Sequence, residues 1–214
     1  MNGQHKYPRT PHLPQSPGAT SDDKWANAAA LRHLASGIDL IATEKMDGGN
    51  VTLATDYFHA RALSGNTPAW ERRAKSHWAT LRADIPLGWR LSCESMWARR
   101  SVAYENLPGP LLVIGVWNAR NEMLDWDSTV EWSNLLTLPT VPLLYRGTDF
   151  AAANRAWQES GKSPTVSEGF VIRSAGIIPY RDFAHNTAKW VRAEHVTTEA
   201  SWLHRNDFET NGIR

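Results

Sequence analysis

Short apolar stretches separated by turn-forming residues run along most of the chain. Residues 39–44 and 51–53 are predicted to be strands around the Asp-Gly-Gly turn at 47–49, because Asp-Gly and Gly-Gly favour tight hairpin turns. Residues 58–63 are predicted to form a third strand after a polar corner. The pattern therefore indicates the start of an antiparallel meander.

Longer apolar patterns predict the remaining strands. Residues 111–117 form an almost unbroken apolar run between Pro110 and Asn118, so we expect a strand that is buried on both faces. The other predicted strands comprise residues 89–94, 141–145, 168–173 and 187–191.

Helical periodicity is clearest over residues 67–83, where Trp70, Ala74, Trp78 and Leu81 fall on one stripe. Capping residues predict three further helices, from Asp22 or Asp23 to Gly37, from Asp127 or Ser128 to Leu136, and from Asp149 to Gln158. Strands dominate without regular βαβ alternation. We therefore predict a mixed α+β fold with largely antiparallel sheets and flanking helices.

The first 23 residues contain prolines at positions 8, 11, 14 and 17. Proline lacks a backbone donor and fixes φ, so we expect an extended segment packed on the body of the protein. The remaining residues, 24–214, are long enough to form a single domain with its own core.

Charge and cysteine content narrow the setting. The 23 Lys and Arg residues nearly balance the 22 Asp and Glu residues, so any site for a polyanion must be local. The single cysteine, Cys93, cannot form an internal disulfide and is expected to be a small buried side chain. No leader or long apolar run is present, so we expect a cytoplasmic monomer without a membrane anchor.

Lys45 lies between two acidic residues at the end of the first predicted strand. Lys-x-Asp-Gly alone is weak evidence of chemistry, since a lysine at a strand end is an ordinary solubilising residue beside a glycine turn. The residues that follow it in the chain give it weight. In order, they are Asn50, Arg61, Glu94, Trp117, Glu168 and Lys189.

This order and spacing resembles the covalent nucleotidyltransferase superfamily of ATP-dependent DNA ligases, RNA ligases and messenger-RNA capping enzymes. The resemblance covers residues 43–192. Within the superfamily, Glu44 before the lysine, Asn50 after it and the sequence EGFV at 168–171 are similar to RNA ligases of the phage nick-sealing type. The resemblance implies an ATP-grasp-like adenylation domain that uses ATP with Mg²⁺ or Mn²⁺.

The resemblance also implies a role for each motif residue. Lys45 would be the nucleophile that attacks the α-phosphorus of ATP, which requires an unprotonated amine. Glu168 would help to hold the metal, because Mg²⁺ and Mn²⁺ prefer hard oxygen ligands. Lys189 would neutralise charge on the phosphates. The remaining implied contacts are the turn of the nucleophile (Asp47, Gly48), ribose and phosphate (Asn50, Arg61), ribose hydroxyls (Glu94), and adenine (Glu44 at its amino group, Trp117 by stacking).

Two positions depart from the family pattern. The family carries Lys-x-Lys on its last motif strand, whereas here Val191 follows Lys189 at that spacing. Either the strand ends and Arg192 turns into the site, or Lys189 contributes alone. Trp117 stands where the family has Phe or Tyr before Asp, so a plain core role fits it equally.

The leading hypothesis is an ATP-dependent RNA ligase that joins RNA 5′-phosphate and 3′-hydroxyl ends, with or without a separate end-healing enzyme. The alternatives are a small DNA ligase, another adenylyltransferase, and a nucleotide- or RNA-binding module without turnover. Only 22 residues follow Arg192, so we expect no C-terminal oligonucleotide-binding barrel or helical domain.

Overall fold

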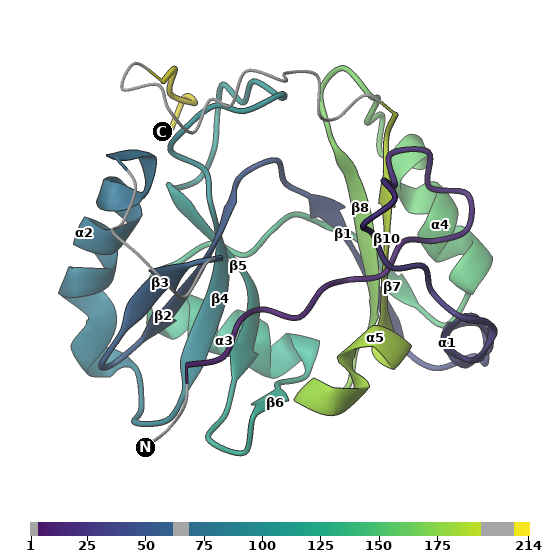
Figure 1. The fold of residues 1–214 in the computed structure, drawn as a ribbon, viewed down its shortest axis with the longest axis horizontal. Coiled ribbons are helices and arrows are strands. Elements are labelled where there is room, and N and C mark those ends of the chain that lie inside the picture. Colours follow the sequence, from purple (N-terminus) through teal and green to yellow (C-terminus); the bar gives the residue numbers. More distant parts are fainter. Residues whose placement is uncertain (1–3, 62–68, 194–207) are drawn as a thin grey trace. The chain divides into compact units, whose positions relative to one another are not determined.

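The structure is a computed structural model that describes residues 4–61, 69–193 and 208–214. It divides into two compact units. Unit 1 comprises Met1–Tyr7, Asp47–Thr140 and Val196–Arg214, and unit 2 comprises Pro8–Met46 and Val141–His195. Each unit is built on an antiparallel sheet with helices against it (Figure 1).

The sheet of unit 2 has the strand order β10-β8-β1-β7, and all its neighbours are antiparallel. Its core contains Leu34, Ala42, Trp157 and Ile172. The strands are β1 (Leu40–Lys45), β7 (Leu143–Gly147), β8 (Gly169–Ser174) and β10 (Thr187–Val191). The other elements of unit 2 are α1 (Ala28–Leu34), α4 (Phe150–Glu159), β9 (Ile178–Pro179), a 3₁₀ turn (Tyr180–Asp182) and α5 (Phe183–Asn186).

The proline-rich segment lies along β10, at the edge of this sheet. Leu13 N–H donates to the Lys189 carbonyl and Lys189 N–H donates to the Pro11 carbonyl, both at 2.8 Å. Gly18 N–H donates to the Val191 carbonyl at 2.9 Å. Figure 1 shows the purple N-terminal trace beside β10. The segment therefore satisfies backbone groups that an edge strand would otherwise expose.

In unit 1 the strands follow the order β3-β2-β4-β5-β6. Val51, Leu91 and Val113 belong to its core, against which Trp78 and Leu81 pack from a helix. The strands are β2 (Gly49–Ala54), β3 (Phe58–Ala60), β4 (Arg90–Ser95), β5 (Leu111–Trp117) and β6 (Glu122–Met123). The helices are α2 (Arg72–Leu81), flanked by 3₁₀ turns at Ala69–Glu71 and Arg82–Asp84, and α3 (Trp126–Leu135).

The mixed α+β architecture is confirmed, but the predicted hairpin at Lys45 is wrong. Strand β1 pairs with β7 and β8, whereas β2 pairs with β3 and β4, so the two strands belong to different sheets. Gly48 and Gly49 also lack the positive φ of a hairpin turn. The local rule fails because β1 pairs with strands about 100 or more residues away, while β2 pairs with the strand that follows it and with β4.

The first helix begins later than predicted, with Asn27 as its N-cap. Asp23 is instead engaged by Thr20, whose backbone N–H and hydroxyl both donate to its carboxylate. Likewise α3 is capped by Asp125 and not by the expected Asp127 or Ser128. The Asp149 cap of α4 and the buried strand β5 are confirmed.

The stripe that was predicted from Trp70 to Leu81 is buried as expected. The ends of two predicted elements, residues 62–63 and 67–68, lie outside the described residues. The short elements β6, β9 and α5 were not predicted, because two to four residues give no periodic signal. No helix among the described residues has the length and apolar character needed to cross a membrane.

Leu13 ties the proline-rich segment to unit 2. Its side chain is 1% exposed within the core of that unit. We expect Leu13→Ala to lower the free energy of unfolding by about 2–5 kcal/mol, because it removes buried methyl groups and leaves a cavity. Urea unfolding followed by tryptophan fluorescence measures this change. Gln15→Ala, at an exposed position of the same segment, is the matched control, and an equal loss in both variants would contradict the anchoring role.

Candidate active site

Lys45 and Glu168 form a short ion pair in unit 2. Lys45 ends β1 and Glu168 immediately precedes β8, and the register pairs Lys45 with Gly169. Lys45 Nζ lies 2.6 Å from Glu168 Oε2, and the Glu168 side chain is only 6% exposed. Removing either partner would leave a charge in a poorly hydrated place. The amine must leave this pair and lose its proton before it can act as a nucleophile.

Lys189 lies on β10, on the other side of β8, opposite Val171. Burial lowers its pKa, and the positive charge of Lys45 lowers it further, while the carboxylates of Asp23 and Glu168 oppose this change. The two predicted catalytic lysines therefore lie on strands that flank β8, and the predicted metal ligand immediately precedes β8.

Val191, at the end of β10, occupies the position of the second lysine in the Lys-x-Lys pattern. Val191 is buried, its N–H donates to Ser16 Oγ and its carbonyl accepts from Gly18 N–H. The strand ends there, and the backbone N–H of Arg192 donates to the Glu168 carbonyl at 3.0 Å. Arg192 thus adjoins Glu168, while a second lysine is replaced by a residue that helps to seat the N-terminal segment.

Glu44 is buried at 2% exposure, although it is charged and adjacent to the nucleophile candidate. Its Oε2 lies 3.0 Å from Lys162 Nζ, and its Oε1 has no hydrogen-bond partner among the described residues. A buried carboxylate oxygen without a partner is costly, so this atom is suited to accept a hydrogen bond from a ligand amino group.

In unit 1, Asp47 fastens a loop. Its Oδ2 accepts from the Ser101 hydroxyl at 2.6 Å and from Val102 N–H at 2.9 Å, and its own N–H donates to the Tyr104 hydroxyl. These contacts tie Asp47 to residues 101–104. They also engage the carboxylate with protein donors.

Gly48 is required by close packing on β4. A Cβ at this position would lie 2.6 Å from both Met96 Sδ and the Ser95 carbonyl oxygen, and 2.8 Å from Glu94 Cγ. These contacts are too short for any side chain, so the glycine lets the backbone approach the strand that carries Glu94.

Asn50 and Glu94 lie on neighbouring strands of unit 1. Asn50 is directly opposite Glu94 in the register of β2 and β4. Directly opposed residues share one face of a sheet, so these two predicted nucleotide contacts lie side by side. Arg61 immediately follows β3, which is the other neighbour of β2.

Trp117 is a core residue. It is fully buried, its indole N–H donates to Ser92 Oγ at 3.1 Å, and the Arg90 guanidinium lies 4.6 Å from its ring centre. The Tyr7 ring meets it edge to face. Of the two interpretations drawn from the sequence, the structure supports the core role and gives no exposed ring face for a base. Cys93 is also buried, and burial raises the pKa of its thiol, so it is inert as a nucleophile.

Glu71 was missed. It precedes α2 at 3% exposure, and its Oε2 has no hydrogen-bond partner among the described residues. A Cβ at Gly49 would overlap its Oε1 and lie 2.9 Å from Arg100 Nη2, so Glu71 and Arg100 both reach the start of β2. Burial raises the pKa of Glu71 to about 7, and Glu94 adds to this, whereas Ser95 and Arg100 oppose it. The sequence signal for its burial was its position directly after Trp70, which belongs to the apolar stripe.

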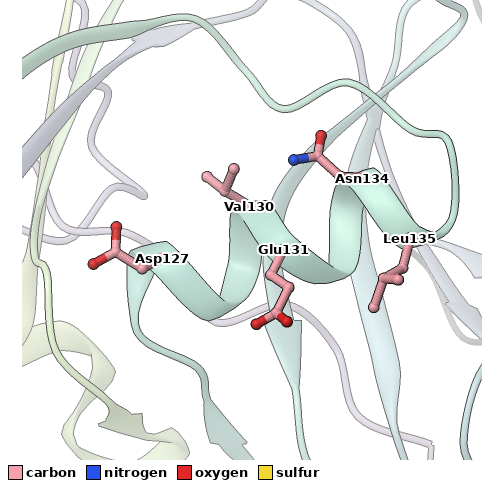
Figure 2. Close-up of a pocket in the computed structure, with 5 residues that line it drawn as sticks. All are labelled: Asp127, Val130, Glu131, Asn134 and Leu135. Atoms are coloured by element: carbon pink, nitrogen blue, oxygen red, sulfur yellow. The ribbon is translucent and has the colours of Figure 1, made fainter.

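One shallow depression lies elsewhere in unit 1. It is lined by side chains of α3, namely Asp127, Val130, Glu131, Asn134 and Leu135 (Figure 2). None of the predicted site residues lines it, so it gives no support to a ligand role. Across the described ranges, no group of three or more His, Cys, Asp or Glu side chains is placed to hold a metal by itself.

The protein has two antiparallel sheets with flanking helices. The sheet of unit 2 brings Lys45, Glu168 and Lys189 together. This is a fold of the nucleotidyltransferase class found in RNA ligases. The RNA ligase family model matches residues 38–191. The chain therefore belongs to the RNA ligase family. No curated protein matches it in sequence.

Solved structures with a similar fold include an archaeal ATP-dependent RNA ligase, with a TM-score of 0.55 and 17% identity over 88% of this chain and 48% of the other. A putative ATP-dependent DNA ligase from Aquifex aeolicus has a TM-score of 0.51 and 15% identity, over 87% and 50%. The Naegleria gruberi RNA ligase with PPi has a TM-score of 0.52 and 15% identity, over 89% and 61%. The chain thus spans about half the length of the first two.

The buried carboxyl of Glu71 should make stability depend on pH. Its pKa is raised from 4.5 to about 7, so the folded state holds a proton that the unfolded state has released between these values. Stability from this group is present below pH 4.5 and is lost as the pH rises towards 7. Glu71→Gln, which stays neutral, should gain about 2 kcal/mol relative to the wild type between pH 5 and pH 8.

Urea unfolding at both pH values measures the Glu71 effect. Glu159→Gln, at an exposed position of α4, is the control and should show no such change. A constant difference between Glu71→Gln and the wild type at pH 5 and 8 would show that Glu71 is ionised throughout.

Proposed function

We propose that this protein is an ATP-dependent RNA ligase that works through a covalent lysyl-AMP intermediate on Lys45. The observation that carries the proposal is the position of Lys45, paired at 2.6 Å with the buried Glu168 and close enough to Lys189 to lower its pKa. Membership of the RNA ligase family supports RNA as the substrate class. The matched residues, 38–191, include Lys45, Glu168 and Lys189.

In the first step, the unprotonated Lys45 Nζ attacks the α-phosphorus of ATP. A P–N bond forms, and the bond between the α- and β-phosphates breaks to release pyrophosphate. The AMP then passes to the 5′-phosphate of an RNA strand as the P–N bond breaks. Finally, a 3′-hydroxyl attacks that 5′-phosphate, so that a phosphodiester forms and AMP leaves.

The charges of unit 2 suit this chemistry. The Glu168 carboxylate pairs with the Lys45 ammonium. It therefore holds the lysine side chain at the end of β1 until the amine is deprotonated. Lys189 supplies positive charge against the negative charge that spreads over the phosphates in the transition state. Arg192, anchored to the Glu168 carbonyl, would add a second cation in place of the missing lysine.

A divalent cation fits the donor set. Mg²⁺ and Mn²⁺ at nucleotide sites take one or two carboxylates together with phosphate oxygens and waters, and Glu168 provides one buried carboxylate. When bound, the cation would neutralise phosphate charge. A variant of the Naegleria gruberi RNA ligase was solved with ATP and Mn, which supports this expectation.

Four polar residues of the first half of the chain would recognise the nucleotide. The partnerless Oε1 of Glu44 suits the adenine amino group, and Glu94 and Asn50 suit the ribose hydroxyls as acceptor and amide. Arg61 suits a phosphate because its guanidinium donates several hydrogen bonds from a fixed plane. We assign no stacking role to Trp117.

Substitution of Lys45 tests the first step. Lys45→Arg keeps a cation for Glu168 but cannot form the phosphoramidate, so it should abolish labelling of the protein by α-labelled ATP and Mg²⁺. Lys75→Ala, at an exposed position of α2, should label like the wild type. Label on the Lys45→Arg protein, or none on the wild type with either metal, would refute the mechanism. Labelling by GTP alone would indicate a capping-type activity.

Matched strands test the substrate. RNA strands with 5′-phosphate and 3′-hydroxyl ends should be joined faster than DNA strands of the same sequence, and gel electrophoresis resolves the products. The Lys45→Arg variant should still join a strand whose 5′ end already carries AMP, because that strand bypasses the first step. Preferential joining of DNA would favour the alternative suggested by the likeness to the Aquifex protein.

A further inference from the structure

The N-terminal segment brings a carboxylate to Lys189. Asp23 Oδ1 lies 3.5 Å from Lys189 Nζ and 3.4 Å from His12 Nε2. The Lys189 side chain is 19% exposed and that of Asp23 28% exposed, so this contact is partly shielded from water. Asp23 precedes the family-matched residues, and its sequence context predicts only the role of a helix cap.

The carboxylate is held from both sides. Its Oδ2 accepts from Thr20 N–H at 3.1 Å and from the Thr20 hydroxyl at 3.0 Å, which leaves Oδ1 for Lys189 and His12. Burial raises the pKa of Asp23, but the Thr20 hydrogen bonds and the charges of Lys189 and His12 outweigh this and lower it to about 2. Asp23 is therefore an anion at any physiological pH.

His12 is the fixed support behind this anion. It is 1% exposed. Its backbone N–H donates to the Lys24 carbonyl, and its backbone carbonyl accepts from Ala26 N–H. Its Nδ1 lies 2.7 Å from Ser16 Oγ, which also accepts from Val191 N–H. A proton on Nε2 points to Asp23. Ser16 is 3% exposed, so this Ser-His-Asp arrangement has no access for a substrate.

The contact between Asp23 and Lys189 is long for a direct hydrogen bond, so it constrains the amine without fixing it tightly. Before the nucleotide arrives, Lys189 faces a second cation, Lys45, and a carboxylate beside it lowers the cost of that arrangement. The phosphates of ATP can then take over as counter-charges. A neutral residue in place of Asp23 would leave Lys189 without its anchor on the N-terminal side.

We propose that Asp23, oriented by Thr20 and His12, is a positioning residue that holds the Lys189 ammonium for the phosphates of ATP. The inference rests on the proposed function, because it gives Lys189 its role there. It also gives the proline-rich segment a purpose beyond edge protection, since the segment carries His12, Thr20 and Asp23 to the strand that bears the lysine.

A double-mutant cycle tests this inference. Asp23→Asn should slow formation of the labelled adduct by about tenfold, whereas in a Lys189→Ala background it should change the rate less than about twofold. Asp23→Glu, which keeps the charge, should recover most of the rate. Asp22→Asn, at the neighbouring exposed residue, should label like the wild type. Equal slowing by Asp23→Asn in both backgrounds would overturn the inference.

Chemical labelling of lysines gives a readout that needs no enzymatic activity. Acylation of the folded protein, followed by peptide mass spectrometry, should modify Lys189 several-fold faster in Asp23→Asn than in the wild type, with Lys24 unchanged. Unchanged acylation of Lys189 would overturn the inference, whether or not the wild type forms an adduct with AMP. Absence of that adduct would by itself refute only the proposed function. If Asp23→Asn folds poorly, Thr20→Ala keeps the charge, loosens the carboxylate and should act in the same direction.

Discussion

The rest of the site depends on the ion pair between Lys45 and Glu168. The pair exists because β1 and β8 are neighbours in a register that sets Lys45 against Gly169. Gly169 itself has a φ of +152°, and a Cβ there would overlap the Trp190 carbonyl oxygen on β10. The start of β8, at Gly169, therefore sets how close Glu168 lies to the two strands that carry Lys45 and Lys189. A charged cluster of this kind is costly to bury unless each charge is compensated, and Glu168 and Asp23 together provide that compensation for Lys45 and Lys189.

Local periodicity predicted the elements better than their pairing. The apolar run of β5, the stripe of α2 and the Asp149 cap were recognised because each signal lies within one element. The hairpin at residues 47–49 was predicted from turn propensity, yet those glycines are needed for contacts with residues 71 and 94–96. Such contacts are distant in sequence, and no periodicity reports them. The contact of Asp23 with Lys189, 166 residues further along the chain, is likewise invisible to a local capping rule.

A motif that sets both residue type and order predicted which residues become neighbours in the fold. Lys45 with Glu168, and Asn50 with Glu94, meet as pairs in the structure, each within one unit. Trp117 shows the limit of that reasoning, because an aromatic residue in an apolar strand fits a core and a base-stacking site equally until its burial is known. Glu71 shows the opposite limit, because a single buried carboxyl has no motif around it. Val191, at the position of the second family lysine, has a buried apolar side chain.

The central claim is that Lys45 carries AMP. Incubation of the wild-type protein with ATP and Mg²⁺, followed by proteolysis at neutral pH and mass spectrometry, locates the adduct on the chain. The account predicts a mass gain of one AMP group on the peptide that contains Lys45, removed by acid and discharged on addition of pyrophosphate. AMP on a peptide without Lys45, or an unmodified Lys45 peptide after incubation with either Mg²⁺ or Mn²⁺, would contradict it.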